Sequence, residues 1–305
     1  MTVLKTKILI GPSSFGETSD EALKLLDTFG FKVVVNPYKR KYTKDELIRL
    51  LGQDVLGIIA GLETLDQEVF AKTKIKVISR CGSGMSNVDV TSARAHNIKV
   101  YSTPDGPTNA VAELTLGAML SLLRMIPVMD RELHDGRWSK KIGHELRGKI
   151  VAIIGFGRIG RKLSEMLKPF DVKILAVDPM LQEKIDCVSV VTLPEALRQA
   201  DIISLHLSGE KEIIGVNELK LVKRGVFLLN AARGDLINEV ALKQALDDKK
   251  IAGVWLDTFL IEPYNGELAK YPQVVLTPHV GSYTVECRNA MELEAAQNLI
   301  KGFRE

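Results

Sequence analysis

The sequence has few cysteines, and they form no recognisable framework. Cys81, Cys187 and Cys287 are far apart and odd in number, and no C-x-x-C motif occurs. This pattern argues against a disulfide scaffold and a cysteine-based zinc site, and it favours reduced thiols in a cytoplasmic protein. No group of histidine, cysteine and acidic residues has the spacing of metal ligands, so the sequence predicts no metal.

Strong net charge and long hydrophobic runs are also lacking. The formal net charge is +3 over 305 residues, with acids and bases interspersed, so a nucleic-acid partner is not expected. The longest apolar stretch, residues 110–129, contains Glu113, Arg124 and Pro127, which indicates a buried or interface helix and no membrane partner. The N-terminus has no apolar signal segment.

The sequence does contain a regular alternation of strand-like and helix-like segments, which predicts parallel sheets covered by helices. Thr43 and Glu46 have the spacing of a capping box at the start of one helix. Expected strands are residues 7–10, 32–35, 57–59, 76–79, 98–101, 149–154, 173–177, 187–190, 202–206, 226–230, 253–257 and 274–277. Other expected helices are residues 21–29, 161–168, 193–198, 239–247 and 285–303.

One longer helix is expected from Thr108 to Leu133, with a bend near Pro127. Its length suits an element that passes between two domains better than a crossover within one. Together with the C-terminal helix it predicts a discontinuous first domain, residues 1–103 and 283–305, into which residues 104–282 are inserted as a second domain.

Residues 149–178 contain every part of a dinucleotide-binding unit. A strand leads directly into Gly155-Phe156-Gly157-Arg158-Ile159-Gly160, a helix follows, and a second strand ends at Asp178. Gly155 permits the tight turn, Gly157 lets the backbone approach a pyrophosphate, and Gly160 lets the helix pack on the strand. The N–H groups at the helix start suit the phosphates. The glycines alone would fit any glycine-rich turn, but in this setting they predict a dinucleotide cofactor.

The end of the second strand indicates which dinucleotide. Asp178 can accept hydrogen bonds from both ribose hydroxyls and would repel a 2′-phosphate. The following residues, Pro179-Met180-Leu181, supply no arginine to neutralise such a phosphate, and Lys184 is nearby but displaced. The sequence therefore predicts NAD rather than NADP.

Three polar residues lie just past strand ends in the second half, where an open α/β sheet binds its ligands. Arg233 can grip a carboxylate with two bonds and polarise the adjacent carbonyl. His279 can give a proton to a developing alkoxide, and a hydrogen bond from Glu262 would orient the imidazole and favour its protonated form. Taken singly, Arg233 would be interpreted as a solvated surface charge, Glu262 as a turn residue and His279 as a structural histidine. Together they indicate hydride transfer from nicotinamide to a 2-keto acid.

At these residues the sequence resembles the D-isomer-specific 2-hydroxyacid dehydrogenases over essentially the whole chain. The matching segments are residues 155–160, 230–234, 257–263 and 277–281. The resemblance implies Arg233, Glu262 and His279 as the catalytic set and Asp257 as a contact to the nicotinamide carboxamide. It implies an α/β fold of two doubly wound parallel-sheet domains, a Rossmann NAD-binding domain inserted into a flavodoxin-like substrate-binding domain.

The same resemblance implies further contacts. Residues 81–84 match the loop whose backbone N–H groups meet the substrate carboxylate. His206 ends a strand on the cofactor side and is expected to line the cleft, whereas His96, His134 and His144 are expected to be surface or packing residues. Other implied cofactor contacts are Arg158, Ile159, Ala231, Ala232 and Gly281. Implied substrate contacts are Arg80, Ser83, Gly84, Arg233 and His279.

Within the family, residues 79–89 and 135–138 most resemble D-3-phosphoglycerate dehydrogenases. Arg80 would then meet the substrate phosphate, or alternatively form a salt bridge in the first domain. Ala60 stands where those enzymes often carry an arginine, Ser86 replaces a common acidic residue, and no C-terminal regulatory domain is expected. The resemblance thus implies an activity like that of D-3-phosphoglycerate dehydrogenase first, with reduction of glyoxylate, hydroxypyruvate or another small 2-keto acid as the alternative that these departures leave open.

Two further expectations concern what the protein binds: a peptide-binding alternative to catalysis, and a second copy of the chain. Some members of the family are NAD(H)-sensing corepressors that bind peptides, and turnover of NADH with 2-keto acids would distinguish an enzyme from such a sensor. The apolar residues of 110–129 exceed what one domain face readily covers, which, like the resemblance, predicts a homodimer formed through the dinucleotide domain.

Overall fold

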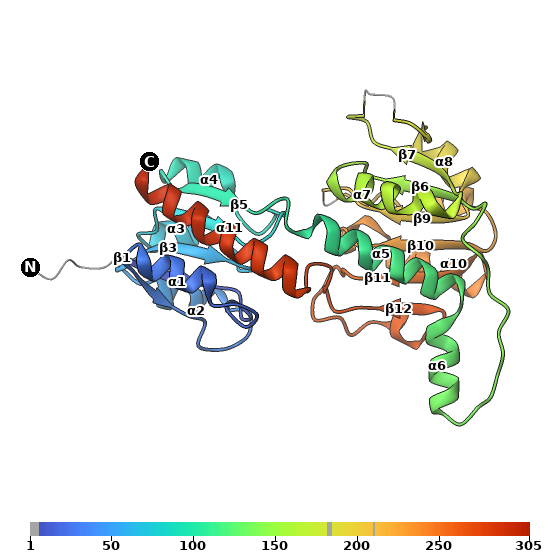
Figure 1. The fold of residues 1–305 in the computed structure, drawn as a ribbon, viewed down its shortest axis with the longest axis horizontal. Helices are drawn as coiled ribbons and strands as arrows, with labels where there is room; N and C mark the ends of the chain where they lie inside the picture. The colour runs from blue at the N-terminus through green and yellow to red at the C-terminus, as the bar shows by residue number, and fades with distance from the viewer. Residues whose placement is uncertain (1–5, 182–184, 210) are drawn as a thin grey trace, which may run out of the picture. The chain divides into compact units, whose positions relative to one another are not determined.

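The protein folds into two compact units, each built around a parallel sheet (Figure 1). The computed structural model describes residues 6–181, 185–209 and 211–305. One unit comprises Met1–Pro107 and Ser282–Glu305, and the other comprises Thr108–Gly281. The second unit is thus inserted into the first, and the predicted fold class is confirmed. The chain passes from the first unit to the second after Pro107 and returns after Gly281.

The first unit has a five-stranded sheet, within the described residues, in the order β2-β1-β3-β4-β5. Every neighbouring pair is parallel. This is the strand order of the flavodoxin-like doubly wound fold, and it puts the carboxyl ends of β1, β3 and β4 side by side. The strands are β1 (Thr6–Ile10), β2 (Phe31–Val34), β3 (Val55–Ala60), β4 (Val77–Arg80) and β5 (Lys99–Ser102).

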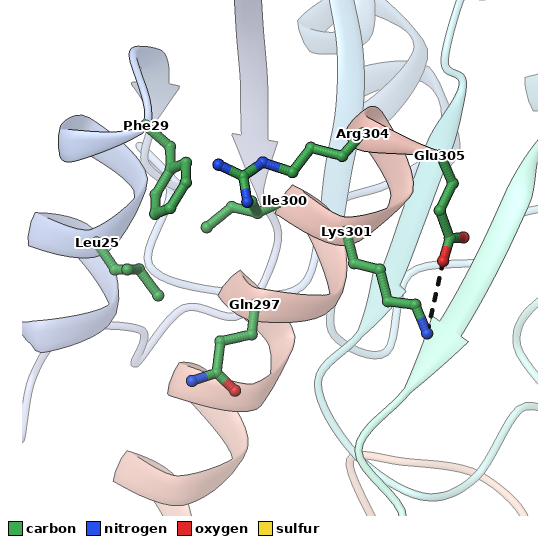
Figure 2. Close-up of a pocket in the computed structure, with 7 residues that line it drawn as sticks. All are labelled: Leu25, Phe29, Gln297, Ile300, Lys301, Arg304 and Glu305. Carbon is green, nitrogen blue, oxygen red and sulfur yellow. Dashed lines mark ion pairs between the residues drawn. The ribbon is translucent and has the colours of Figure 1, made fainter.

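Helices cover both faces of this sheet. The C-terminal helix α11 (Val285–Arg304) packs on β3, β4, β5 and on α1 (Glu21–Thr28). Between α11 and α1 lies a surface pocket of about 370 Å³, where the Arg304 guanidinium lies 4.6 Å from the centre of the Phe29 ring (Figure 2). The remaining helices of this unit are α2 (Lys44–Leu51), α3 (Gln67–Lys72) and α4 (Val90–Ala95).

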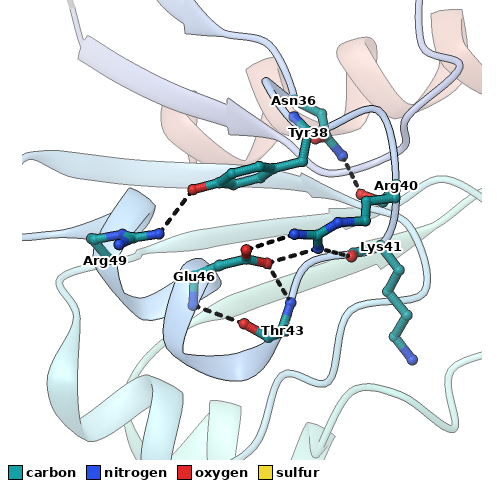
Figure 3. Close-up of polar contacts among 7 residues, drawn as sticks. All are labelled: Asn36, Tyr38, Arg40, Lys41, Thr43, Glu46 and Arg49. Atoms are coloured by element: carbon teal, nitrogen blue, oxygen red, sulfur yellow. Dashed lines mark hydrogen bonds and ion pairs between the residues drawn. The ribbon is translucent and has the colours of Figure 1, made fainter.

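The start of α2 shows how a local sequence signal becomes structure (Figure 3). The Thr43 hydroxyl accepts a hydrogen bond from the Glu46 N–H, and the Glu46 carboxylate accepts one from the Thr43 N–H. The predicted capping box is therefore confirmed. Glu46 also binds the Arg40 guanidinium through two hydrogen bonds of 2.7 and 2.8 Å, so this network fixes the loop between β2 and α2.

The second unit has a seven-stranded parallel sheet, within the described residues, in the order β12-β11-β10-β9-β6-β7-β8. Read from β8, this is the Rossmann order with one strand added, and the strand order reverses between β6 and β9. The strands are β6 (Ile150–Ile154), β7 (Lys173–Val177), β8 (Val188–Val190), β9 (Ile202–Leu205), β10 (Val226–Asn230), β11 (Ile251–Leu256) and β12 (Val274–Leu276).

Alternation along these strands creates two cores, one on each face of the sheet. Ala152 and Ile154 of β6 belong to one apolar cluster, whereas Val151 and Ile153 belong to the other. The second cluster also contains the fully buried Trp255 of β11. The covering helices are α5 (Pro107–Leu123), α7 (Arg158–Leu167), α8 (Leu193–Gln199), α9 (Val216–Leu221) and α10 (Glu239–Asp247), whereas α6 (Ile126–His134) buries none of its residues.

The helix predicted from Thr108 to Leu133 has a bend close to the predicted position near Pro127, but the bend is sharp enough to divide it into two helices. α5 and α6 are separate helices that meet at a 66° bend. The break falls at Met125, which adopts a left-handed conformation with φ 52°, and Pro127 lies in the first turn of α6, where its missing N–H costs nothing. No single described helix is long and apolar enough to cross a membrane; only this bent pair passes by length and composition, and much of α5 is buried in the second core.

Other differences from the sequence predictions are small. α7 begins at Arg158 rather than Arg161, so Ile159 and Gly160 form part of its first turn. Three six-residue helices, α3, α4 and α9, were not predicted because they contain too few turns to show a periodic apolar face.

Candidate active site

The carboxyl edge of the second sheet brings together three polar side chains from three separate loops. Arg233 follows β10, Glu262 follows β11 and His279 follows β12. The Nδ1 atom of His279 lies 3.1 and 3.0 Å from the two carboxylate oxygens of Glu262, and both side chains are about one-third exposed, 37% and 32%. Because Glu262 occupies Nδ1, the other ring nitrogen of His279 is available to a substrate.

A glycine makes this meeting of loops possible. A Cβ atom on Gly234 would lie 2.0 Å from the carbonyl carbon of Phe259 and 2.2 Å from the Leu260 nitrogen. The loop that carries Glu262 therefore crosses directly over the residue after Arg233. Any side chain at position 234 would push the two loops apart.

The loop that carries Arg233 is held by a buried amide. Asn230 accepts a hydrogen bond from the Ala232 N–H and donates one to the Arg233 carbonyl, so its side chain spans the turn. Arg233 itself donates to the Ala232 carbonyl at 2.7 Å. No role for Asn230 was predicted from the sequence, although one signal marks it: it is a polar residue at the end of an apolar strand.

Charge keeps Glu262 ionised. Partial burial opposes its negative charge, but the hydrogen bond and charge of His279, the Phe259 N–H and the charge of Arg233 together hold the pKa of Glu262 below its usual value. The carboxylate therefore remains an acceptor for the imidazole throughout the neutral range. A negatively charged partner favours the protonated form of an imidazole, which is the form that acts as a general acid.

Asp257 lies at the end of β11 and is almost fully buried. Its two carboxylate oxygens accept three hydrogen bonds, from the Thr277 hydroxyl (2.6 Å), the Val280 N–H (2.9 Å) and the Gly281 N–H (2.8 Å). All three donors belong to the segment that carries His279. Oδ2 accepts only one of these bonds and so keeps a lone pair for the predicted contact to a carboxamide.

The turn between β6 and α7 has the geometry of an anion cradle. Gly155 has φ 90°, and a Cβ atom there would lie 2.4 Å from the Leu207 nitrogen. A Cβ atom on Gly160 would lie 2.4 Å from the Gly155 carbonyl oxygen, so both positions require glycine. Gly157 differs, because a Cβ atom there would meet nothing within 4 Å. The space next to the start of α7 is therefore open to a phosphate group.

Asp178 is fixed beside this turn. Its carboxylate oxygens accept hydrogen bonds from the Phe156 N–H (2.8 Å) and the Met180 N–H (2.9 Å). Each oxygen keeps a lone pair that a ribose hydroxyl can use. The open turn, the helix start and the oriented acid together fit a dinucleotide. Lys184 lies outside the described residues.

Residues 116–281 match the family model of the D-isomer specific 2-hydroxyacid dehydrogenase, NAD binding domain. The chain belongs to this family. Its second unit is thus the NAD-binding domain of a D-2-hydroxyacid dehydrogenase, and the family resemblance seen in the sequence is confirmed. The match covers the dinucleotide turn, Asp178 and all three candidate catalytic residues.

Relatives of this dehydrogenase differ in substrate. It is 34% identical over 268 residues to a hydroxypyruvate reductase of Thermotoga maritima, covering 85% of this chain and 88% of that protein. It is 32% identical over 293 residues to a D-3-phosphoglycerate dehydrogenase of Archaeoglobus fulgidus, covering 92% of this chain but only 55% of that protein. The chain thus spans about half the length of that relative.

Relatives also differ in cofactor, as one solved structure shows. The NADPH-dependent glyoxylate/hydroxypyruvate reductase of Sinorhizobium meliloti, in complex with NADP and malonate, has a TM-score of 0.84 and 29% identity. The match covers 98% of this chain and 94% of that one. The family therefore includes members with either nicotinamide dinucleotide.

His206 follows β9, next to the point where the strand order reverses. Its Nε2 atom lies 2.7 Å from the Ser204 hydroxyl, and its Nδ1 atom is buried with no hydrogen-bond partner among the described residues. Burial lowers the pKa of His206 to about 4, so the imidazole is neutral at neutral pH. The predicted contacts Ala231 and Ala232 lie in the turn after β10, one strand further along.

The predicted substrate residues Arg80, Ser83 and Gly84 lie in the first unit. Ser83 is exposed in the loop after β4, and the Arg80 guanidinium folds over Gly82 and donates to the Cys81 carbonyl. The buried Glu63 lies at the same sheet edge, where burial raises its pKa and the charge of Arg80 acts in the opposite direction. Sequence reasoning did not identify Glu63, because it stands in a polar turn after β3.

His96, His134 and His144 are exposed, and all three cysteines are free. In the part of the chain that the structure describes, no group of three or more His, Cys, Asp or Glu residues is arranged to hold a metal ion. The pocket between α1 and α11 contains none of the candidate catalytic residues.

We predict that His206 makes the protein sensitive to acid. In the unfolded chain His206 binds a proton near its ordinary pKa of 6.5, whereas in the fold it does so only near 4. Folding stability therefore falls as the pH drops through this window, by about 2 kcal/mol at pH 5. His206→Gln keeps a group that can bond Ser204 but cannot titrate. Its melting temperature should drop several degrees less than that of the wild type between pH 7.5 and pH 5.

The matched control is His134→Gln, because the His134 side chain is 81% exposed. This variant should show the pH dependence of the wild type. Equal acid sensitivity in His206→Gln and the wild type would contradict the prediction.

Proposed function

We propose that this family member is an NAD-dependent enzyme that interconverts a small D-2-hydroxy acid and its 2-keto acid. The observation that carries the proposal is the His279–Glu262 pair next to the loop of Arg233, at the carboxyl edge of the NAD-binding sheet. An acid/base, a charge that orients it and a guanidinium are the groups that this reaction needs from a protein.

The proposed roles follow from the chemistry of each group. Arg233 binds the substrate carboxylate and polarises the neighbouring carbonyl. Bound NADH supplies the hydride that forms the new C–H bond at C2. His279 gives the proton from its Nε2 atom to the carbonyl oxygen, which becomes the hydroxyl group of the product, and takes it back in the reverse direction. The negative charge of Glu262 stabilises the imidazolium before the transfer. The exposed loop at Ser83 and Gly84 supplies backbone N–H groups to the carboxylate.

The proposed substrate is unphosphorylated, such as hydroxypyruvate or glyoxylate. The edge where the substrate loop begins supports this choice, because the side chain buried there is the carboxyl group of Glu63 and not a cation that would bind a phosphate. Ala60 supplies no cation there, and the Arg80 guanidinium is already engaged with the Cys81 carbonyl. Oxidation of D-3-phosphoglycerate is the second candidate, favoured by the position of Arg80 beside that loop.

The deciding experiment is NADH oxidation with a panel of 2-keto acids at equal concentration: glyoxylate, hydroxypyruvate, pyruvate and 3-phosphohydroxypyruvate. We expect the highest kcat/KM with one of the first two. Highest efficiency with the phosphorylated compound would instead support the second candidate. NADH binding without turnover of any member of the panel would favour a nucleotide sensor.

We predict distinct kinetic signatures within the catalytic set. His279→Ala should lower kcat on the order of a hundredfold or more. Arg233→Ala should raise KM as well as lower kcat, and Arg233→Lys should restore little, because an ammonium cannot form the two-pronged bond. Glu262→Gln keeps the hydrogen bond but removes the charge that favours imidazolium. The alkaline limb of its pH–rate profile for reduction should therefore move to lower pH. A Glu262→Gln profile identical to that of the wild type would show that Glu262 does not tune His279.

We predict a preference for NADH over NADPH of at least about tenfold in kcat/KM, because the Asp178 carboxylate would face a 2′-phosphate. Asp178→Ala should weaken NADH binding and bring the two efficiencies closer together. Glu165→Ala, an exposed acid on α7, is the control and should change neither. Comparable efficiency of the wild type with both cofactors would rule out this role of Asp178.

We propose a homodimer formed by the second unit. Much of the apolar face of α5 is buried within the chain, but α6 and the loop after it leave Leu133, Trp138 and Ile142 exposed, the last two by 81% and 97%. A pocket of about 170 Å³ lies beside Ile142, and a second copy of this surface would cover these side chains.

Light scattering at micromolar concentration should give twice the chain mass of 33.7 kDa. Ile142→Ser together with Trp138→Ser should shift the protein toward the monomer. Met180→Ser, which changes an equally exposed side chain elsewhere, should not. A monomeric mass for the wild type would refute the dimer.

A further inference from the structure

A chain of hydrogen bonds runs behind His279 and has a fixed direction. The Trp255 indole nitrogen lies 3.0 Å from the Thr277 hydroxyl oxygen, which lies 2.6 Å from Oδ1 of Asp257. An indole N–H can only donate, so the Thr277 oxygen accepts from Trp255. The hydroxyl proton of Thr277 must then point to Asp257. The fully buried Trp255 thus fixes the direction of the Thr277 O–H bond, which could otherwise rotate freely.

The geometry of the sheet explains why these residues meet. β11 and β12 pair in parallel with Trp255 opposite Val275 and Leu256 opposite Leu276. The next pair along the two strands is Asp257 and Thr277, at the point where both strands end. The bond between their side chains therefore joins the two strands at their last position, before the chain turns into the loop that carries His279.

That loop has a conformation that needs support. His279 has φ 54°, in the left-handed region that non-glycine residues rarely adopt, and its N–H donates to the Thr277 carbonyl at 2.9 Å. Asp257 holds the segment on both sides of His279, through Thr277 before it and through the Val280 and Gly281 N–H groups after it. The imidazole reaches Glu262 only while this backbone conformation is kept.

We propose that Thr277 is a positioning residue for the acid/base: its hydroxyl, oriented by Trp255, ties Asp257 to the start of the His279 loop and so keeps the imidazole against Glu262. This inference rests on the proposed function of His279. Thr277 itself does not touch the reacting atoms. The charged groups of this unit around His279 are Glu262 in direct contact, Asp257 through the loop backbone, and Arg233 through its effect on Glu262.

The test compares Thr277→Val, which has the same shape without a hydroxyl, with Thr277→Ser, which keeps the hydroxyl. Thr277→Val should lower kcat about tenfold or more, because small displacements of a catalytic group are costly, and should leave the Kd for NADH within about twofold. As the pH is raised, the reduction activity of Thr277→Val should fall at a lower pH than that of the wild type, because Glu262 holds the imidazole less firmly. Thr277→Ser should restore kcat to within about threefold.

The matched control is Thr115→Val in α5. Thr115 is a fully buried threonine of the same unit, and its hydroxyl donates to the Val111 carbonyl within the helix. Both valine substitutions remove one hydrogen-bonded hydroxyl, but only Thr277→Val should change the pH–rate profile. A kcat of Thr277→Val equal to the wild-type value, or a loss that Thr115→Val reproduces, would overturn the proposal.

A second measurement separates this inference from the proposed function. The imidazole signals of the five histidines can be followed by NMR during a pH titration, with His279 assigned through His279→Gln. The His279 titration should differ between the wild type and Thr277→Val and return toward the wild type in Thr277→Ser. If no 2-keto acid is turned over, the proposed function fails, and this titration still decides the positioning role.

An unchanged His279 titration in Thr277→Val would overturn the proposal irrespective of activity. If Thr277→Val does not fold, Thr277→Cys takes its place, because a thiol is similar in size to the serine hydroxyl but is a weak donor. Thr277→Cys should then behave as described for Thr277→Val, and activity equal to that of Thr277→Ser would overturn the inference.

Discussion

The buried carboxylate of Asp257 is the interaction on which the geometry of the catalytic edge depends. A carboxylate removed from water must be satisfied by hydrogen bonds, and this one is satisfied by three donors from a single loop. The requirement works in both directions. Asp257 needs the loop in order to be buried, and the loop needs Asp257 in order to hold His279 in a left-handed conformation. Buried groups thus define the position of the partly exposed His279 side chain, the proposed acid/base.

Two glycines also determine how closely the loops of the site can approach one another. Gly234 lets the loop of Glu262 pass over the loop of Arg233, and Gly155 lets the dinucleotide turn approach the backbone at His206 and Leu207. In both places a Cβ atom would collide with backbone, which cannot move aside as a flexible side chain can. Two ligand-binding features, the guanidinium–carboxylate–imidazole cluster and the phosphate turn, therefore depend on contacts that only glycine allows.

An arginine acts on a nearby glutamate in each unit. In the NAD-binding unit, the charge of Arg233 helps to hold the pKa of Glu262 below its usual value. At the first unit, Glu63 places an acid at the edge from which the substrate loop leaves, and the charge of Arg80 acts on it.

The sequence alone determined the two parallel sheets, the inserted domain, the dinucleotide turn with Asp178, and the placement of Arg233, Glu262 and His279 at strand ends. Each of these rests on a local pattern: apolar runs, glycine spacing, or a polar residue after a strand. Only the tertiary structure decided the sharp 66° angle at Met125, the hydrogen bonds of Thr277 and the burial of Glu63. The helix breaks where a left-handed residue directs the chain away from the core, and Thr277 bonds a tryptophan and an aspartate of the neighbouring strand. Glu63 matters through burial at the end of β3. Such contacts join residues that are distant in sequence, so no local pattern records them.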